Sequence, residues 1–484
     1  MPMPKLNDPA LLKEACLVAG KWVPAGADAI EVTNPSTGEV IGRVPKLGAK
    51  ETDEAIEAAR IAQKDWAKRT AEERANVLMK WHDLMMAAQD DLGAIMTAEQ
   101  GKPLAEAKGE VAYGASFIKW FAEEARRTNG EVIPGHQPDK RIVVIKQPVG
   151  VVAAITPWNF PNAMITRKAG PALGAGCAMV LKPASQTPFS AIALGVLAER
   201  AGLPLELFSI LTGSASAIGG AMTASETVRA LTFTGSTEVG AKLYEQCAPT
   251  IKKLGLELGG NAPFLVFDDA DVDAAVEGAV IAKFRNNGQT CVCANRIYVQ
   301  SGVYDEFAEK LAKKVSTMKT GDGFDEGVNF GPLIDEAGLE KVRDHVEDAK
   351  SKGAKVILGG EAHEKGGTFW QPTVLTGVDT SMKVTTEETF GPVAPLFKFE
   401  TEEEAIEAAN ATEFGLASYF YARDLSRVWR VSEALDYGMV GINTGLISTA
   451  VAPFGGVKQS GLGREGSTHG MEEFMELKYL CMNV

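Results

Sequence analysis

Cysteine and histidine are scarce in this chain of 484 residues, which has six cysteines and five histidines. The cysteines are mostly scattered, so the sequence does not predict the disulfide framework of a secreted protein. No His-x-x-x-His or Cys-x-x-Cys motif gathers the ligands that a metal site needs, so no metal is expected. Cysteine usage of this kind favours a reducing, cytoplasmic compartment.

Positive charge is also in short supply. Lysine and arginine number 49 against 63 aspartates and glutamates, so the formal net charge is −14. This balance argues against nucleic acid and anionic membranes as partners, although a local cationic pocket can still hold a small anion. The N-terminal residues lack a charged-then-apolar signal pattern, and no apolar run is long enough to span a bilayer.

What the chain does have is a regular alternation of short apolar runs with helical patterns. Residues 51–127 have helical periodicity, with aromatic and methionine side chains that we expect in the core. Beyond Gly150, four apolar runs alternate with helices, at residues 151–156, 178–182, 207–211 and 229–233. A second round of strands and helices starts near residue 254. This alternation predicts an α/β fold with doubly wound parallel sheets of the nucleotide-binding type.

Two β-rich segments interrupt this pattern. Residues 141–147 and 478–484 are both typical of strands, and the first is flanked by prolines. Because an exposed strand edge tends to be paired or covered, we expect the segments 130–148 and 472–484 to form an oligomerisation arm. The predicted assembly is a homodimer or homotetramer.

Two glycine-rich stretches compete as the phosphate-binding turn. Residues 461–466 match G-x-G-x-x-G but lack a strand–turn–helix context, so we interpret them as a loop. Residues 235–240 do not match that motif, yet they follow a strand and open a helix, where a dinucleotide phosphate binds. An ordinary βα turn remains the alternative for this second stretch.

The stretch from Phe284 to Arg296 contains a pair of cysteines, Cys291 and Cys293, in polar surroundings. A buried cysteine usually serves as a small apolar residue. A polar setting instead favours a reactive thiol, which attacks carbonyl carbon when a base or a polarised environment activates it.

Six short motifs occur in a fixed order along the chain, at residues 156–161, 182–185, 233–236, 257–261, 288–291 and 387–392. Together they resemble the NAD(P)-dependent aldehyde dehydrogenase superfamily, from about Val32 to the C-terminus. Within it, residues 165–170, 283–296 and 443–448 resemble the succinate-semialdehyde dehydrogenases. The resemblance implies a dinucleotide-binding domain over residues 1–129 and 149–256 and a catalytic domain over residues 257–471.

The resemblance also implies catalytic roles. Cys291 attacks the aldehyde carbon, and Asn159 and the Cys291 backbone N–H stabilise the alkoxide. After hydride transfer to the nicotinamide, Glu257 activates the water that hydrolyses the thioester. The alternatives are a strand-end carboxylate for Glu257 and a helix N-cap for Asn159.

The cofactor contacts that the resemblance implies are Thr156, Trp158, Lys182, Ser185, Gly213, Gly235, Ser236, Glu388 and Phe390. Ser185 stands where NAD-preferring relatives often carry glutamate, which repels a 2′-phosphate. With serine there beside Lys182, we expect NADP to be preferred and NAD to be used as well.

Arg167, Arg285 and Ser448 are the expected substrate contacts. A carboxylate at the far end of the aldehyde needs cations, and arginine can bind it bidentately. The sequence therefore predicts oxidation of succinic semialdehyde to succinate, with glutarate semialdehyde or another short aldehyde as the alternative. A solvated or ion-paired arginine is the alternative role for each arginine.

Two further hypotheses concern the cysteines. A cysteine-dependent esterase or thioesterase is the alternative enzyme class, but no histidine lies in a motif beside Cys291. Cys293 is either a spectator or a partner in a reversible disulfide with Cys291, and residues so close in sequence often cannot close such a bond.

Overall fold

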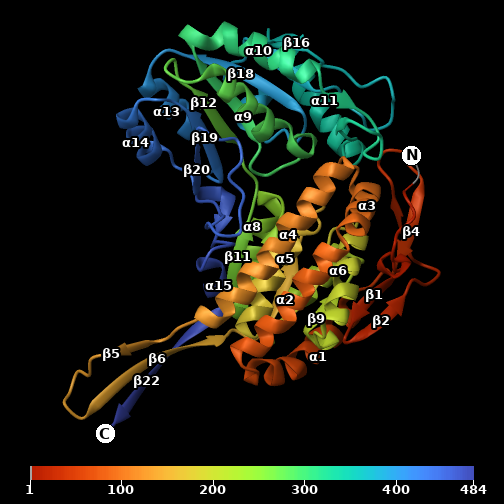
Figure 1. The fold of residues 1–484 in the computed structure, drawn as a ribbon, viewed down its shortest axis with the longest axis vertical. Helices are drawn as coiled ribbons and strands as arrows, with labels where there is room; N and C mark the ends of the chain where they lie inside the picture. Colours follow the sequence, from red (N-terminus) through yellow and green to blue (C-terminus); the bar gives the residue numbers. More distant parts are fainter. Residues whose placement is uncertain (1–2) are drawn as a thin grey trace.

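The computed structural model describes residues 3–484, which form two α/β bodies and a projecting arm (Figure 1). The first body is built on a sheet with the strand order β2-β1-β9-β8-β7-β10-β11-β21. Its parallel strands are β9 (Phe208–Ile210), β8 (Ala178–Lys182), β7 (Val151–Ile155), β10 (Val228–Thr234) and β11 (Lys253–Glu257). The winding reverses between β7 and β10, and ligands bind at the carboxyl ends of strands at such a switch point.

Antiparallel strands close both edges of this sheet. They are β1 (Ala15–Val18) and β2 (Lys21–Pro24) at one edge and β21 (Gly461–Leu462) at the other. β21 pairs with Leu256 and Glu257, so the stretch 461–466 is not simply a loop as the sequence suggested. The prediction failed because this short strand is specified by the unpaired edge of β11 and not by its own residues.

Helices cover this first sheet. They are α1 (Ala49–Lys68), α2 (Ala71–Ala87), α3 (Gln89–Gln100), α4 (Leu104–Glu124), α5 (Ala163–Ala175), α6 (Pro188–Ala201), α7 (Ala215–Ala224) and α8 (Thr237–Cys247). The aromatic stripes are buried as expected, with Trp66 and Trp81 each 1% exposed. Helix α4 packs against both α2 and α5, which places it directly behind the loop that follows β7.

The second body has a sheet with the order β16-β17-β18-β13-β12-β19-β20. The strands are β12 (Ala262–Val266), β13 (Ala294–Gln300), β16 (Lys355–Leu358), β17 (Thr373–Thr376), β18 (Val393–Phe399), β19 (Ala417–Tyr421) and β20 (Met439–Ile442). All neighbours are parallel except β16 and β17. The doubly wound α/β fold predicted from the sequence is therefore confirmed.

The helices of this second body are α9 (Val272–Phe284), α10 (Tyr304–Ser316), α11 (Glu336–Ser351), α12 (Lys383–Thr386), α13 (Glu402–Asn410) and α14 (Leu425–Ala434). The short helix α15 (His469–Glu472) returns to the first body, where it packs against α5. Two small sheets complete the chain, β3 (Ile30–Thr33) with β4 (Val40–Val44) and β14 (Lys319–Thr320) with β15 (Val328–Phe330). Among residues 3–484, no helix combines the length and the apolar character that crossing a membrane requires.

The arm extends away from both bodies (Figure 1). It consists of β5 (Glu131–Ile133), β6 (Lys140–Pro148) and β22 (Met475–Asn483). β22 runs antiparallel to β6 from Met475 opposite Pro148 to Asn483 opposite Lys140. The two β-rich segments recognised in the sequence thus pair with each other.

Candidate active site

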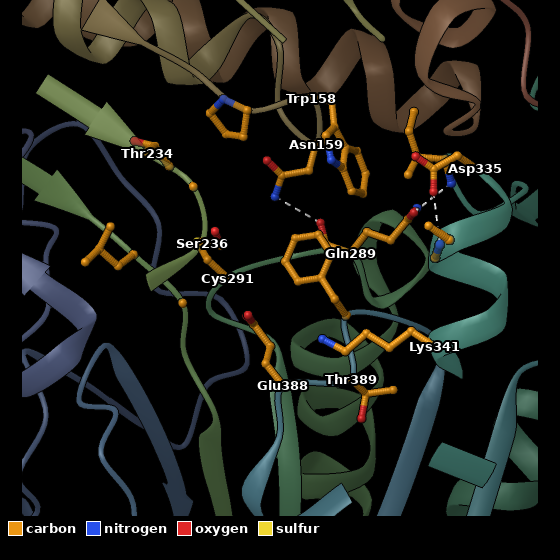
Figure 2. A pocket seen from close by; sticks show the side chains of 18 of the residues that line it. Trp158, Asn159, Thr234, Ser236, Gln289, Cys291, Asp335, Lys341, Glu388 and Thr389 are labelled. Atoms are coloured by element: carbon orange, nitrogen blue, oxygen red, sulfur yellow. Dashed lines mark hydrogen bonds between the residues drawn. The ribbon is translucent and has the colours of Figure 1, made fainter. Parts of the chain in front are cut away.

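A cavity of about 370 Å³ lies where the two sheets face each other (Figure 2). One wall follows the carboxyl ends of β7 and β10 and includes Trp158, Asn159 and Ser236. The other wall comes from segments preceding β13 and β18, with Cys291 and Glu388, and from the start of α11. The cavity therefore occupies the switch point of the first sheet and the amino ends of the second.

An unusual backbone run places Cys291 at this cavity. Asn286, Asn287 and Gly288 have φ values of 51°, 58° and 74°, all in the left-handed region. Asparagine tolerates this region better than most residues, and glycine enters it freely. A Cβ on Gly288 would lie 2.2 Å from the carbonyl oxygen of Gly391, so only glycine fits there. The Asn-Asn-Gly sequence is thus explained by the turn that it makes.

The Cys291 thiol is half-buried, and its charge state depends on its neighbours. Burial raises its pKa to about 12, against the pull of Arg167 and Arg285 and with a further rise from Glu388 and Glu257. The thiol is therefore protonated at neutral pH in this state. Attack on a carbonyl carbon needs a group that removes this proton.

Asn159 is buried and lines the same cavity as Cys291. Its Nδ2 donates to the Gln289 carbonyl at 3.1 Å, a contact that ties it to the cysteine segment (Figure 2). The N-cap residue of α5 is Asn162, so the N-cap alternative for Asn159 is wrong. A neutral amide donor beside the thiol is the group that a developing oxyanion requires.

Glu257 lies apart from this cavity. It ends β11, is 4% exposed, and lines a cavity of about 20 Å³ together with Arg464 and Glu465. Burial holds its pKa well above the usual range; the Glu465 carboxylate adds to the rise, and the cations Arg167 and Lys168 oppose it. Its Oε2 has no hydrogen-bond partner among the described residues. A buried carboxyl with a raised pKa has the properties of a general base, although it does not face the main cavity.

A second, small cavity also reaches Cys291. Its volume is about 10 Å³, and the predicted substrate residues Arg167, Arg285 and Ser448 all line it. Arg285 lies over the ring of Phe160, with its Cζ 5.3 Å from the ring centroid.

Arg167 is more constrained than the sequence suggested. It forms an ion pair with Glu465, so the ion-paired alternative is correct for one side of its guanidinium group. Its Nη2 is buried without a hydrogen-bond partner among the described residues and remains able to bind an anion. Lys168, the next residue, also pairs with Glu465.

The sequence analysis missed Tyr113 in this second cavity. Its hydroxyl is buried beside Ser448 in the cavity; burial raises the pKa of this phenol, and Arg167, Arg285 and Ser448 oppose the rise. Tyr113 lies on α4 among apolar residues, so its helical spacing indicated a core position.

The predicted cofactor contacts fall into two groups. Trp158, Gly235, Ser236, Glu388 and Phe390 line the main cavity. Ser236 caps α8, and the rings of Trp158 and Phe390 meet edge to face at 5.5 Å. The stretch at Gly235 is thus a βα turn that also forms a wall of the cavity.

The remaining predicted cofactor contacts do not line this cavity. They lie in the segments at the carboxyl ends of neighbouring strands, with Thr156 after β7, Lys182 and Ser185 at and after β8, and Gly213 after β9. The Thr156 hydroxyl is buried without a partner among the described residues. These residues, with Trp158, Gly235 and Ser236, lie along one edge of the first sheet, across which an extended dinucleotide can bind, and Glu388 and Phe390 face that edge from the second body.

Lys341 is a cavity residue that sequence reasoning missed. It extends from α11 toward Glu388 (Figure 2). Burial raises the pKa of Glu388 to about 7, and the charge of Lys341 opposes this rise. Helix α11 begins at Glu336, after the N-cap Asp335, and its first turns supply Ala337, Gly338 and Lys341 to the cavity wall.

Cys293 is 1% exposed and contacts Lys283. Lys283 Nζ donates to its Sγ at 3.3 Å, and the thiol donates to the Lys283 carbonyl at 3.2 Å. All six cysteines are free thiols. The disulfide between Cys291 and Cys293 stays a prediction.

Comparisons with known proteins agree with this geometry. A sequence model described as "Aldehyde dehydrogenase family" matches residues 22–480. The chain is 64% identical to a succinate-semialdehyde dehydrogenase [NADP(+)] of Escherichia coli, over 99% of this chain and 100% of that protein. It is also 64% identical to a glutarate-semialdehyde dehydrogenase of Pseudomonas aeruginosa, over 99% of each chain. The crystal structure of an Escherichia coli NADP-dependent enzyme superimposes with a TM-score of 0.98 at 63% identity, covering 99% of this chain and 100% of the other.

Proposed function

Because the chain belongs to the aldehyde dehydrogenase family, we propose that it oxidises succinic semialdehyde to succinate with NADP. The observation that carries this proposal is the pair of arginines, Arg167 and Arg285, in a cavity that also reaches Cys291. A short aldehyde with a terminal carboxylate would place its carbonyl carbon at Cys291 and its carboxylate at these arginines. Glutarate semialdehyde is the second candidate, because a relative named for it is as similar as the one named for succinate semialdehyde.

In the proposed reaction, the Cys291 thiol releases its proton to the solvent, and Sγ bonds to the aldehyde carbon. The carbonyl oxygen gains negative charge, which Asn159 Nδ2 and the Cys291 backbone N–H stabilise by hydrogen bonds. A bound dinucleotide would supply the hydride acceptor, and loss of hydride from that carbon would leave a thioester on Cys291. Glu257 then takes a proton from the water that attacks the thioester, and the carboxylate product leaves the free thiol.

The residues along the first sheet fit a dinucleotide. Gly235 and Ser236 open α8, where the helix N-terminus favours phosphate. Lys182 and Ser185 would hold the adenosine ribose, and Glu388 with Lys341 the nicotinamide ribose. Ser185 is partly exposed and uncharged, so it does not repel a 2′-phosphate. This supports NADP as the preferred cofactor, with NAD also used, and a similar relative is named for NADP(+).

A kinetic panel tests the substrate and the cofactor together. It compares succinic semialdehyde, glutaric semialdehyde and butanal, each with NADP and with NAD. The expected result is the highest kcat/KM for succinic semialdehyde with NADP. An equal kcat/KM for butanal would contradict the acid-aldehyde proposal, and an equal or better value with NAD would contradict the cofactor preference.

Arg285→Ala is expected to raise KM for succinic semialdehyde about 10- to 100-fold, since a charge-assisted hydrogen bond contributes about 1.5–3 kcal/mol. KM for butanal should change little, because butanal has no carboxylate. Arg285→Lys serves as the matched control, since it keeps the charge and loses bidentate binding. A variant that discriminates between the two aldehydes as well as the wild type does would show that Arg285 does not bind the carboxylate.

We also propose that the arm assembles the chain into a homodimer or homotetramer. The arm exposes apolar side chains, with Val132 at 85%, Leu477 at 69% and Tyr479 at 58%. Deleting residues 475–484 is expected to lower the molar mass in light scattering to that of a smaller assembly, because it removes β22 and exposes the edge of β6. An unchanged mass would rule out this role. Substituting Leu477 and Tyr479 with glutamate keeps the chain length and serves as the control.

The remaining assignments follow from these proposals. The body on the first sheet binds the dinucleotide, and the body on the second supplies the nucleophile. A cytosolic location suits an enzyme with a catalytic thiol, and cell fractionation tests it.

A further inference from the structure

A cluster of charged residues lies behind the active site, and the proposed reaction does not use it. Glu106 and Glu110 are four residues apart and share one face at the start of α4, and Lys102 lies just before this helix, two residues ahead of Leu104. Lys102 is 3% and Glu110 4% exposed, and Glu106 is partly buried. We call these three residues the α4 charge cluster.

Lys102 connects this cluster to Asn159. Its Nζ donates to Glu110 at 2.5 Å and to the backbone carbonyl of Asn159 at 2.7 Å. The same ammonium group lies 4.2 Å from the ring centroid of Phe160, the ring on which Arg285 also rests. One buried cation thus contacts the oxyanion residue and the ring that supports the substrate arginine.

Glu110 fixes the beginning of α5. Its Oε1 accepts hydrogen bonds from the backbone N–H groups of Asn162 at 2.9 Å and Ala163 at 3.2 Å. No side chain at the N-cap of α5 makes this contact, so a carboxylate from α4 caps the helix instead. Because Arg167 lies on α5, the same contact sets its position.

Glu106 extends the cluster to the nucleophile segment. Its Oε2 accepts from the backbone N–H of Asn286 at 2.9 Å, the first residue of the left-handed run. The Asn286 side chain then donates to the carbonyls of Asn159 at 2.9 Å and Gln289 at 3.1 Å. The cluster therefore contacts both segments that meet at the thiol.

We propose that the α4 charge cluster positions Asn159 against Cys291, with Lys102 as its central positioning residue. Buried ion pairs contribute little net stability, because desolvation offsets their attraction. The contacts of this cluster go to the backbone on both sides of the reaction centre, and that is where a small displacement is costly for catalysis. The inference rests on the proposed function in one respect, that Asn159 stabilises the oxyanion.

The test uses the double variant Lys102→Met/Glu110→Gln. Lys102→Met alone leaves a buried carboxylate without its cation, which destabilises the fold in itself. In the double variant, the glutamine Oε1 still caps α5, and the ammonium group of residue 102 is lost with its hydrogen bond to the Asn159 carbonyl and its contact with Phe160. We expect kcat for succinic semialdehyde to fall about 10- to 100-fold, since a displacement of about 1 Å can cost that much. KM for NADP should stay within about twofold, because the cluster does not line the main cavity.

Hydrolysis of p-nitrophenyl acetate without a dinucleotide gives a second measurement. The same thiol and the same oxyanion donors act on an ester, so the rate should fall in parallel with kcat. If the wild type hydrolyses the ester but does not oxidise succinic semialdehyde, the proposed function fails. Loss of ester hydrolysis in the double variant would then still support the positioning role.

Lys252→Met is the matched control. Lys252 is 8% exposed and donates to the backbone carbonyl of Val228 at 2.9 Å, at the end of β10 opposite the cavity. The Lys252→Met substitution should lower the melting temperature without lowering kcat. Wild-type kcat and ester hydrolysis in the folded double variant would overturn the proposal, and so would losses no larger than those of the control. If the double variant does not fold, Lys102→Arg replaces it as the test. The bulkier, planar guanidinium group should lower kcat at least several-fold. A wild-type kcat in Lys102→Arg would overturn the proposal.

Discussion

Cys291→Ala is expected to lower kcat/KM for succinic semialdehyde by about 10⁴-fold or more, to the background of the assay. Without the thiol no covalent adduct forms, so the carbon that must lose hydrogen is never held in place. No other cysteine of residues 3–484 lines either cavity that reaches Cys291. The fold should persist, because a half-buried thiol contributes little packing. Steady-state assays with NADP, together with the melting temperature, measure both effects.

Cys293→Ala is the control for this variant. Its thiol contacts Lys283 and lines neither cavity, so kcat should stay within a few-fold of the wild type. Retention of more than about a hundredth of wild-type kcat/KM in Cys291→Ala would contradict the role of Cys291 as the nucleophile. If peroxide inactivates the wild type reversibly and Cys293→Ala equally, the disulfide hypothesis is wrong.

The second large effect is expected from Glu257→Gln. Kcat should fall about 10²- to 10⁴-fold, the usual contribution of a general base. The amide keeps the size of the side chain but cannot take a proton from water, so the thioester accumulates. Rapid mixing should then show one equivalent of reduced dinucleotide per active site, followed by slow turnover. If the burst is lost, Glu257 also removes the proton from the Cys291 thiol. A wild-type kcat in Glu257→Gln would contradict its assignment as the general base.

The pH dependence gives an independent check on Glu257. Burial raises its pKa, so the carboxyl is protonated, and inactive as a base, at pH values below that raised pKa. Kcat of the wild type should therefore increase as pH rises through it, and this increase should be absent in Glu257→Gln. Glu473→Gln is the matched control, because Glu473 lines the same small cavity and also has a pKa raised by burial.

The sequence predicted the parts of the site that local pattern controls. The strand–helix alternation located both sheets, and the motifs placed Asn159, Ser236 and Cys291 in segments that follow or precede core strands. The Asn-Asn-Gly run before Cys291 was visible in the sequence, although its left-handed geometry was not. These features are specified by residues close together in the chain.

The contacts of the site that the sequence did not predict form between segments that are distant in the chain and depend on how those segments pack. Glu465 pairs with Arg167 and Lys168, which lie 298 and 297 positions away by their residue numbers, and its own stretch resembled a loop. Lys102 and Tyr113 fell within a helical region whose spacing indicated ordinary core and surface positions. A helical pattern specifies which face of the helix is buried, but it does not specify which polar groups from distant segments contact that face.

The edge strands of the molecule have a consequence for its biosynthesis. The edge of the first sheet at β11 is completed only by β21, and β6, which pairs with β5 on one side, finds the partner for its other side only in β22. A ribosome therefore releases the last strands of the first body after the whole of the second has been made. Until then the edges of β11 and β6 stay unpaired, and unpaired edges in nascent chains invite aggregation. Chains that terminate before β21 and β22 therefore lack the strands that protect what has already folded.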